Sequence, residues 1–277
     1  MSAPSPDRAA VVLCGGLSTR MGRPKADLPF GTETLAGRVA RICSEACGEV
    51  VVVAAAGQEV PGLPAGTTVV RDERPEQGPL EGLAVGLAAV RAPAAFCTSC
   101  DVPFLRPEFI GRMFAALGDA AASQAVVDGM AQPLLAVYRS SLAPKAARLV
   151  AEGRRRVIFL VEGERVAVVP DPDLRCFRNL NTPEEYRAAF LRVELFGIAR
   201  HRAGREAVDI PAAATLGEAL ALVAGAIPAL VGPVITVEGA LAPGSVASLD
   251  GEKFVTDPAT PLPAGRPLLL LPASAGG

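Results

Sequence analysis

A glycine-rich, basic loop follows a short apolar run near the beginning of the chain, with the sequence LCGGLSTRMGRPK at positions 13–25. Gly15 and Gly16 allow the backbone to pass close to a ligand and to turn its N–H groups toward anionic oxygens. Arg20 and Lys25 add positive charge to the same segment. These residues predict a phosphate-binding loop, although the spacing matches neither the Walker A motif nor G-x-G-x-x-G. The alternative is a glycine-rich surface turn with solvated cations.

Alternating strand-like and helix-like stretches must position this loop. The segment 49–54 is apolar on both faces, which is typical of a parallel strand covered on both sides. Gly82 and Gly86, four positions apart, predict a closely packed helix. The order of elements predicts a Rossmann-like doubly wound α/β sheet, in which ligands bind beyond the carboxyl ends of the strands. We expect strands at 11–14, 49–54, 68–70, 94–98, 125–127, 134–138 and 166–169, and helices at 35–46, 80–90, 107–117, 141–151 and 183–190.

The pattern changes near Leu191, where apolar and polar residues begin to alternate. After a polar turn, the segment 206–210 is the expected hairpin partner of the strand at 191–196. Thr215 and Glu218 have the spacing of a capping box and predict a helix to position 225. Further short strands are expected at 234–238, 253–256 and 267–271. We therefore expect a first domain at 1–190 and a small α+β domain at 191–277.

Composition excludes several classes of protein. Half of the 277 residues are hydrophobic, and 27 Lys and Arg against 29 Asp and Glu give a net charge of −2. This balance argues against a general nucleic-acid or membrane-surface binder, which usually carries a basic excess. The first residues lack the apolar core of a signal peptide, and no stretch reaches the roughly 20 apolar residues of a membrane span. We expect a soluble, cytoplasmic protein.

Two alternative chemistries involve cysteine and histidine. Cys97 and Cys100 form a C-x-x-C pair, and together with Cys43 and Cys47 they could provide four thiolates for zinc. The favoured interpretation is that these cysteines are small apolar core residues, because residues 95–97 already resemble a buried strand. His201 is the only histidine, so a Ser-His-Asp or Cys-His hydrolase would have to use it. Its polar neighbours predict an exposed side chain instead.

The loop resembles the signature of enzymes that transfer a nucleoside monophosphate from a nucleoside triphosphate, written L-x-G-G-x-S-x-R-M-G-x-x-K. The chain is most similar to the molybdenum cofactor guanylyltransferases (MobA-like), over roughly residues 9–190. Cytidylyl relatives tend to have L-A-A-G where this chain has LCGG, which favours GTP. Later landmarks of the family follow in order: Asp72, Gly78-Pro79-Leu80-x-Gly82, Cys100-Asp101-Val102-Pro103 and Asn179-x-Asn181-Thr182-Pro183-Glu184.

The resemblance implies roles for these positions. Asp101 follows an expected buried strand and is a hard oxygen ligand that suits Mg²⁺; the alternative is that it caps the turn at Pro103. Lys25 and Arg20 would neutralise the α-phosphate and the departing pyrophosphate, so we expect Lys25 and Asp101 on either side of the reacting phosphorus. The implied nucleotide-binding residues are Leu13, Cys14, Gly15, Gly16, Lys25, Asp72, Gly78 and Asp101.

The implied acceptor is the terminal phosphate of molybdopterin that already carries molybdenum. Asn179 and Asn181 match family positions near the acceptor or metal, but Asn181 could equally cap the following helix. Arg155 and Arg156, in the basic run 154–156, could hold the pterin phosphate or form a solvated helix end. Ala54 departs from the family, which usually has an Asn there, and loss of that hydrogen bond would cost about 1 kcal/mol of GTP binding.

The C-terminal segment resembles the ubiquitin-like small subunit of molybdopterin synthase (MoaD-like). The segments 196–200 and 257–277 carry this likeness, which implies a β-grasp domain ending in Gly276-Gly277. It also implies that an E1-like enzyme adenylates the Gly277 carboxylate, that a persulfide converts it to a thiocarboxylate, and that the large synthase subunit uses it. Glycine without side chains suits a tail that enters a narrow active site.

Two other functions stay open at this point. One is a nucleotidyltransferase of the same superfamily that uses CTP or another acceptor. The other is a non-catalytic scaffold, permitted by Ala54, in which only the sulfur-carrier tail works.

Overall fold

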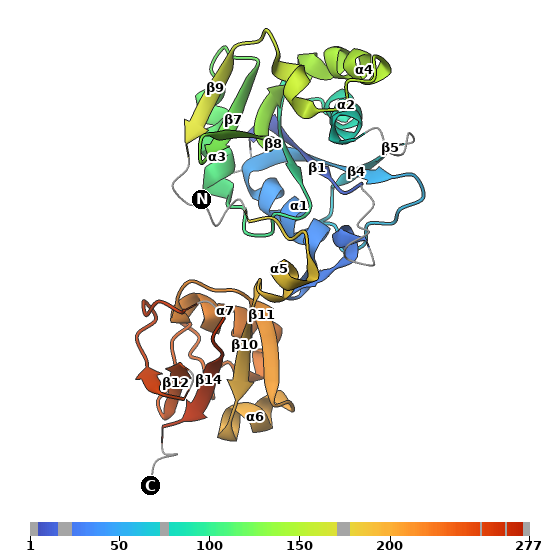
Figure 1. Ribbon diagram of the computed structural model, residues 1–277. Helices are drawn as coiled ribbons and strands as arrows, with labels where there is room; N and C mark the ends of the chain where they lie inside the picture. Colours follow the sequence, from blue (N-terminus) through green and yellow to red (C-terminus); the bar gives the residue numbers. More distant parts are fainter. Residues whose placement is uncertain are drawn as a thin grey trace. The chain divides into compact units, whose positions relative to one another are not determined.

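The computed structural model describes residues 5–15, 24–72, 78–170, 178–249, 251–263 and 265–273. By contacts the chain divides into two compact units. The first comprises Met1–Pro29 and Glu33–Asn181, and the second comprises Phe30–Thr32 and Thr182–Gly277. Each unit is described by itself (Figure 1). No helix in the described part of the chain is long and apolar enough to cross a membrane.

The first unit, as far as it is described, is built on a seven-stranded sheet in the order β5-β4-β1-β6-β8-β7-β9. The neighbours β5, β4, β1 and β6 are parallel, whereas β8 runs antiparallel to both β6 and β7. The predicted doubly wound α/β fold is therefore confirmed, with one reversed strand. The strands are β1 (Ser5–Leu13), β4 (Cys47–Ala55), β5 (Thr68–Asp72), β6 (Ala94–Ser99), β7 (Ala122–Val127), β8 (Met130–Arg139) and β9 (Val166–Pro170).

Helices cover both faces of this sheet, so its central strands are apolar on both sides (Figure 1). Successive residues of β1 face opposite sides of the sheet. One set packs on α1 and α3, and the other set packs on α2. The helices are α1 (Leu35–Ala46), α2 (Pro79–Ala89), α3 (Pro107–Leu117) and α4 (Ala143–Ala151), with 3-10 turns η1 (Lys25–Asp27), η2 (Ser140–Leu142) and η3 (Val157–Val161) and the short strands β2 (Pro29–Phe30) and β3 (Glu33–Thr34).

Glycine in α2 permits its close approach to the sheet. A Cβ added at Gly86 would overlap Cγ1 of Val11, and one at Gly82 would lie 3.3 Å from Cδ2 of Leu13. The predicted close packing at these two glycines is confirmed. Any larger residue at Gly86 would push the helix away from β1, the strand that carries the glycine-rich loop.

The strand order reverses at β1, which lies between β4 and β6. Ligands of open α/β sheets bind beyond the carboxyl ends of the strands at such a reversal. Backbone hydrogen bonds keep the neighbouring strand ends together there. Cys14 N donates to Val53 O at 2.8 Å, and Cys100 N donates to Leu13 O at 3.0 Å. The loops after β1 and β6 therefore begin side by side.

The described part of the second unit contains a five-stranded sheet in the order β11-β10-β14-β12-β13. Its first and last strands, β10 and β14, are parallel neighbours, and the other pairs are antiparallel. With α7 packed in its core, this is the predicted β-grasp arrangement. The elements are α5 (Pro183–Arg187), β10 (Phe190–Leu195), α6 (Gly197–Ala203), β11 (Ala207–Pro211), α7 (Leu216–Ala226), η5 (Pro228–Leu230), β12 (Ser245–Leu249), β13 (Lys253–Val255) and β14 (Leu268–Pro272).

Three local expectations in the second unit were wrong. The segment 234–238 forms only two isolated bridges, both at Ile235, because Val237 is 81% exposed and provides no buried strand face. The strand in that region is β12, which the sequence pattern did not predict because its buried residues are small. The expected polar turn after β10 is the helix α6, and the helix expected to reach position 190 ends at Arg187.

Candidate nucleotide and metal site

Three polar side chains from distant parts of the sequence meet at the carboxyl edge of the first sheet. Lys25 opens η1, Asp101 follows β6, and Asn181 lies before α5. The Lys25 ammonium donates to Oδ2 of Asp101 at 2.9 Å and to Oδ1 of Asn181 at 2.7 Å. The Lys25 and Asp101 side chains are 19% and 12% exposed, so this ion pair is largely shielded from solvent. The lysine thus directly contacts the carboxylate that was expected across the reacting phosphorus from it.

Two further hydrogen bonds fix Asp101, one at its side chain and one at its backbone carbonyl. Ser99 Oγ donates to Oδ1 of Asp101, and Leu180 N donates to the Asp101 carbonyl at 2.9 Å. Sequence reasoning missed Ser99. Ser99 ends β6 and Asp101 lies in the turn that follows, so the strand periodicity gave no signal for this contact.

Asn181 does not cap the following helix. The N-cap of α5 is Thr182, whose side chain accepts from Glu185 N at 3.1 Å, and Glu185 returns a bond to Thr182 N at 3.0 Å. Because the cap is already made, the Asn181 side chain is available to Lys25. The capping role is therefore excluded, the structure shows a contact with Lys25, and a place for Asn181 near the acceptor or metal stays a prediction.

The end of β1 presents backbone groups beside β4. Leu13 and Cys14 are buried, and a Cβ on Gly15 would lie 3.4 Å from Ala55 N, which is a close approach. Gln58 joins the two strand ends, because its Nε2 donates to Cys14 O at 3.3 Å and its Oε1 accepts from Ala55 N at 3.1 Å. Gln58 was missed, since nothing in a loop sequence indicates such a bridge. Ala54, where the family usually has an Asn, is fully buried.

Other predicted residues lie along the same edge or near α2. Asp72 ends β5, and its carbonyl accepts from Ala56 N at 3.1 Å. Gly78 precedes α2 with φ +79°, and a Cβ there would lie 3.3 Å from the Arg155 carbonyl. The structure therefore brings Arg155 to the start of α2.

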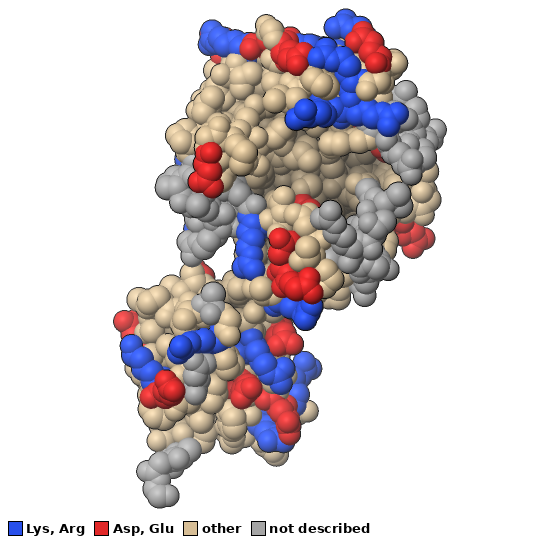
Figure 2. All heavy atoms as spheres, in the orientation of Figure 1, with Lys and Arg blue, Asp and Glu red and all other residues tan. Residues whose placement is uncertain are grey.

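The three arginines of the basic run 154–156 differ in their surroundings. The Arg154 guanidinium lies 4.1 Å from the centroid of the Phe159 ring and pairs with Glu162, which favours a structural role. Arg155 and Arg156 are exposed. Figure 2 shows a hollowed region on the first unit with Lys and Arg side chains along one rim.

Four predicted site residues have no described contact with this cluster. Gly16, Arg20 and Gly277 lie outside the described residues. Asn179 is exposed. For these positions the roles implied by resemblance stay predictions.

Five cysteines of the first unit lie within the described residues, and all five are buried thiols. Burial raises the pKa of Cys43 and Cys97, and it raises the pKa of Cys47 to about 12. A hydrogen bond with Cys100, followed by burial, raises the pKa of Cys14. Zinc ligation needs thiolates, and among the described residues no group of three His, Cys, Asp or Glu side chains could hold a metal ion. His201 is exposed on α6, as its polar neighbours predicted.

The donor set at the sheet edge fits a hard divalent cation. Mg²⁺ takes oxygen ligands, is bound through one or two carboxylates, and completes its shell with water and substrate phosphates. The Asp101 carboxylate and the Asn181 amide oxygen provide such donors, both joined by one ammonium. The cluster already binds one cation, and its chemistry therefore suits a metal ion held jointly with a polyphosphate.

A mostly parallel sheet with a lysine and an acidic residue where its strand order reverses is an arrangement that suits the binding of a nucleotide phosphate and a metal ion. The family model of the MobA-like NTP transferase domain matches residues 10–167. The chain belongs to this family and is a nucleotidyltransferase.

Relatives agree with this assignment. The chain is 37% identical, over 186 residues, to a probable molybdenum cofactor guanylyltransferase of Mycobacterium avium (strain 104), covering 65% of this chain and 93% of that protein. The crystal structure of molybdopterin-guanine dinucleotide biosynthesis protein A from Archaeoglobus fulgidus has the same fold, with 23% identity and a TM-score of 0.53 over 65% of this chain and 95% of that chain. A Mycobacterium tuberculosis H37Rv protein crystallised with manganese matches with 20% identity and a TM-score of 0.50, over 65% of this chain and 96% of that chain.

The C-terminal part is similar to SAMP1 from Haloferax volcanii, with 29% identity and a TM-score of 0.28, over 32% of this chain and 99% of that chain. We assign the β-grasp fold to the second unit from its own strand order.

Proposed function

We propose that the first unit transfers GMP from GTP to the terminal phosphate of molybdenum-bearing molybdopterin. In this reaction an acceptor phosphate oxygen forms a bond to the α-phosphorus, the bond to the bridging α–β oxygen breaks, and pyrophosphate leaves. The observation that carries the proposal is the Lys25 ammonium placed between Asp101 and Asn181 at the carboxyl edge of β1 and β6. The identity with a probable guanylyltransferase supports the choice of base and acceptor.

The residues of this chain contribute positioning and charge, which are what phosphoryl chemistry needs most. The backbone at Leu13–Gly15 contacts the base, and Gly78 lets α2 begin close to the nucleotide. Lys25 shifts from Asp101 and Asn181 toward the phosphates and offsets charge on the departing pyrophosphate. Arg155 and Arg156, with Asn179, hold the acceptor phosphate. Arg20 and Asp72 are further proposed nucleotide ligands.

Asp101 and Asn181 would hold Mg²⁺, which neutralises developing charge on phosphate oxygens when it is bound. Manganese in the related Mycobacterium tuberculosis structure supports a divalent ion of this kind. Asp101 keeps a fixed orientation through Ser99, so its Oδ2 stays directed to the same point.

The test is to incubate the protein with each of GTP, CTP, ATP and UTP, together with molybdenum-bearing molybdopterin and Mg²⁺. We expect guanine dinucleotide product and pyrophosphate with GTP, and loss of both in Asp101→Asn. Product from CTP in place of GTP would contradict the base assignment. Equal turnover by Asp101→Asn and the natural protein would contradict the site, and cofactor formation without any nucleotidyl transfer would favour a scaffold.

For the second unit we propose a sulfur-carrier function, over a domain that spans 191–277. The β-grasp topology supports it, because β14 lies in the middle of the sheet and leads to the C-terminal Gly276-Gly277. An E1-like enzyme would adenylate the Gly277 carboxylate, and a persulfide with a second thiol as reductant would leave a thiocarboxylate. The large subunit of molybdopterin synthase would then use that sulfur.

Intact-protein mass spectrometry tests this function after incubation with the activating enzyme, ATP and a sulfur donor. We expect a gain of about 16 Da, in which sulfur replaces oxygen. A variant without Gly276-Gly277 should gain nothing. An unchanged mass of the full chain would contradict the proposal.

A further inference from the structure

The loop that carries Asp101 is fixed to three other parts of the first unit. Cys100 N donates to Leu13 O at 3.0 Å, and the Asp101 carbonyl accepts from Leu180 N at 2.9 Å. The third attachment is at Pro103, whose carbonyl accepts from Nε of Arg38 at 2.7 Å. The first two are backbone bonds, whereas the third comes from the charged side chain of Arg38 and is separate from the ion pair that Lys25 makes with Asp101 itself.

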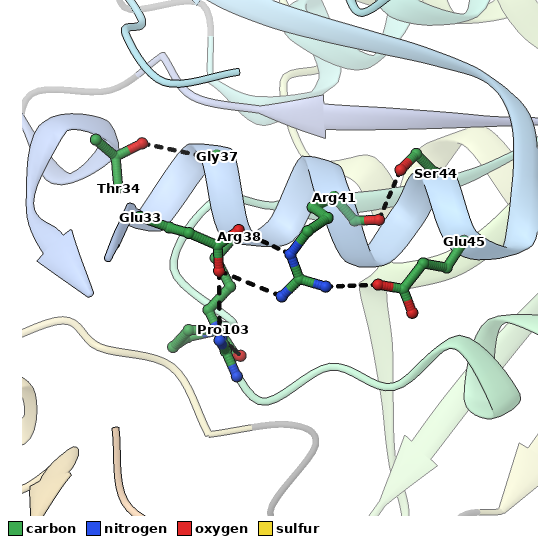
Figure 3. Close-up of polar contacts among 8 residues, drawn as sticks. All are labelled: Glu33, Thr34, Gly37, Arg38, Arg41, Ser44, Glu45 and Pro103. Carbon is green, nitrogen blue, oxygen red and sulfur yellow. Dashed lines mark hydrogen bonds and ion pairs between the residues drawn. The ribbon is translucent and has the colours of Figure 1, made fainter. Parts of the chain in front are cut away.

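Arg38 is well placed for this bond on α1. Its side chain is only 20% exposed, and Figure 3 shows it extending from the helix toward Pro103. A hydrogen bond from a charged donor is stronger than one between neutral groups, and more so away from water. Burial lowers the pKa of Arg38 and Glu33 opposes that change, but an arginine remains a cation at any physiological pH.

Arg38 belongs to a group of four charged side chains on α1 and in β3 (Figure 3). Glu33 Oε2 lies 3.5 Å from Nη1 of Arg38, and Glu33 Oε1 accepts from Nε of Arg41 at 2.7 Å. Arg41 also pairs with Glu45 one turn further along α1. The charges of two acidic and two basic residues cancel, so the group adds no net charge beside the loop.

Few rotatable bonds separate the Arg38 contact from the Asp101 carboxylate. Pro103 has its φ fixed by the ring, and the intervening Val102 is 1% exposed and locked in the core. Holding the Pro103 carbonyl therefore restricts the backbone on the far side of Val102. Without the guanidinium, that carbonyl loses its donor and the loop gains freedom next to the carboxylate.

We infer that Arg38 is a positioning residue for the reaction, which aims the Asp101 carboxylate at the metal and phosphates through the Pro103 carbonyl. This inference rests on the proposed function, because Asp101 must be the metal ligand for Arg38 to matter to turnover. Arg38 itself touches neither substrate nor metal. A merely structural arginine would change the stability of the protein but not its requirement for metal.

The experiment compares the full-length natural protein with Arg38→Met, Arg41→Met and Asp101→Asn. Arg41→Met is the matched control, since it removes the same kind of side chain from the same helix without touching Pro103. The measurements are the Mg²⁺ concentration for half-maximal GTP turnover, Mn²⁺ binding with GTP followed by electron paramagnetic resonance, and hydrogen exchange of the Leu180 amide without metal. Thermal unfolding reports on folding.

For Arg38→Met we expect the Mg²⁺ requirement and the Mn²⁺ dissociation constant to rise about tenfold, as for other supports of metal ligands. The Leu180 amide should also exchange about tenfold faster, since the Asp101 carbonyl that it contacts becomes looser. Arg41→Met should stay within about twofold of the natural protein on all three measurements. If Arg38→Met does not fold, Arg38→Lys replaces it, with an expected rise of about threefold because a lysine lacks the fixed guanidinium fork.

Unchanged metal dependence and exchange in a folded Arg38 variant, while Asp101→Asn is inactive, would overturn the inference alone. Equal turnover in the natural protein and Asp101→Asn, or no turnover in either, would overturn the proposed function itself. An equal rise in Arg38→Met and Arg41→Met would show a general effect of α1 and would also overturn the inference.

Discussion

The Lys25 ammonium donates to the side-chain oxygen of Asn181 at 2.7 Å, although 156 positions separate the two residues in the sequence. The same ammonium contacts Asp101 at 2.9 Å. One cation therefore joins the segment after β1, the loop after β6 and the segment before α5. A bound triphosphate would compete with these two residues for the lysine, so nucleotide binding and the arrangement of the site are coupled.

Replacing Lys25 by Met should reduce the proposed guanylyl transfer by about 10²- to 10³-fold, because a largely shielded cation that would face the developing charge is lost. Most of the loss should appear in kcat. Steady-state kinetics at saturating GTP measures it.

Lys145→Met is the matched control for that prediction. Lys145 is 20% exposed, close to the 19% of Lys25, and it also pairs with a carboxylate, that of Glu164 at 2.7 Å. Its contacts lie between α4 and the segment before β9 rather than at the site, so turnover should stay within about twofold. Similar losses in both variants would show that lysine removal acts through folding and not through the reaction.

Ser99→Ala should weaken metal binding without removing a ligand. Ser99 Oγ donates to Asp101 Oδ1, and loss of a support to a metal ligand costs about tenfold in metal affinity or activity. Titration of activity with Mg²⁺ checks it.

Ser123→Ala provides the contrast for Ser99→Ala. Its hydroxyl is fully buried and donates to Met113 O at 2.7 Å, so the change should lower the free energy of unfolding by about 1 kcal/mol. The Mg²⁺ titration should not move. If Ser99→Ala behaves in the same way, Ser99 supports the fold and not the carboxylate.

Gln58→Ala should raise KM for GTP about fivefold, since one hydrogen bond worth about 1 kcal/mol to the Cys14 carbonyl disappears. The backbone beside Gly15 then loses its link to β4, while the phosphate-binding lysine is untouched, so kcat should change little. Gln132→Ala removes a comparable side-chain bond, to Met130 O at 3.3 Å, in a hairpin elsewhere and should leave KM unchanged. A fall in kcat with constant KM would contradict the view that Gln58 positions the backbone proposed to contact the base.

Stability should decrease at alkaline pH because buried thiols keep their protons. The pKa of Cys47 is raised from 9.0 to about 12, so above pH 9 the unfolded chain releases a proton that the folded chain retains. The stabilisation is complete below pH 9 and is lost as the pH rises toward 12, by about 1.4 kcal/mol per pH unit for each such thiol. Cys43 and Cys97 act in the same direction.

Urea unfolding between pH 8 and pH 10.5 under reducing conditions measures this slope. Cys47→Ala should reduce the slope by about 1.4 kcal/mol per pH unit, the contribution of one proton. Equal slopes for Cys47→Ala and the natural protein would show that the Cys47 thiol ionises as readily folded as unfolded.

The sheet and the position of the site followed from local pattern. Strands apolar on both faces indicate a covered parallel sheet, and such a sheet fixes which loops share an edge. The sheet pattern placed the loop after β1 and the position of Asp101 at one edge, whereas Asn181 was assigned to the site only through the family resemblance. Gly82 and Gly86 were informative for the same reason, because a helix close to β1 requires them.

Residues that act through long-range side-chain geometry could not be found in this way. Arg38 and Gln58 reach loops 65 and 44 positions away, and no periodicity records such contacts. Asn181 was ambiguous because a capping residue and an amide ligand have the same local sequence. The choice depended on Thr182, which takes the cap with Glu185. Strand β12 escaped notice because its buried positions are Ser and Ala.

The second unit includes Phe30–Thr32, a segment taken from far upstream in the chain. The Phe30 ring is 1% exposed and lies 5.1 Å, centroid to centroid, from the ring of Phe190. Cleavage of the chain at a single bond after Asn181 would release the second unit without Phe30, one of its buried aromatic residues. Such a product would be less stable than the same unit in the intact chain, so we expect the proposed sulfur transfer to use the uncleaved protein.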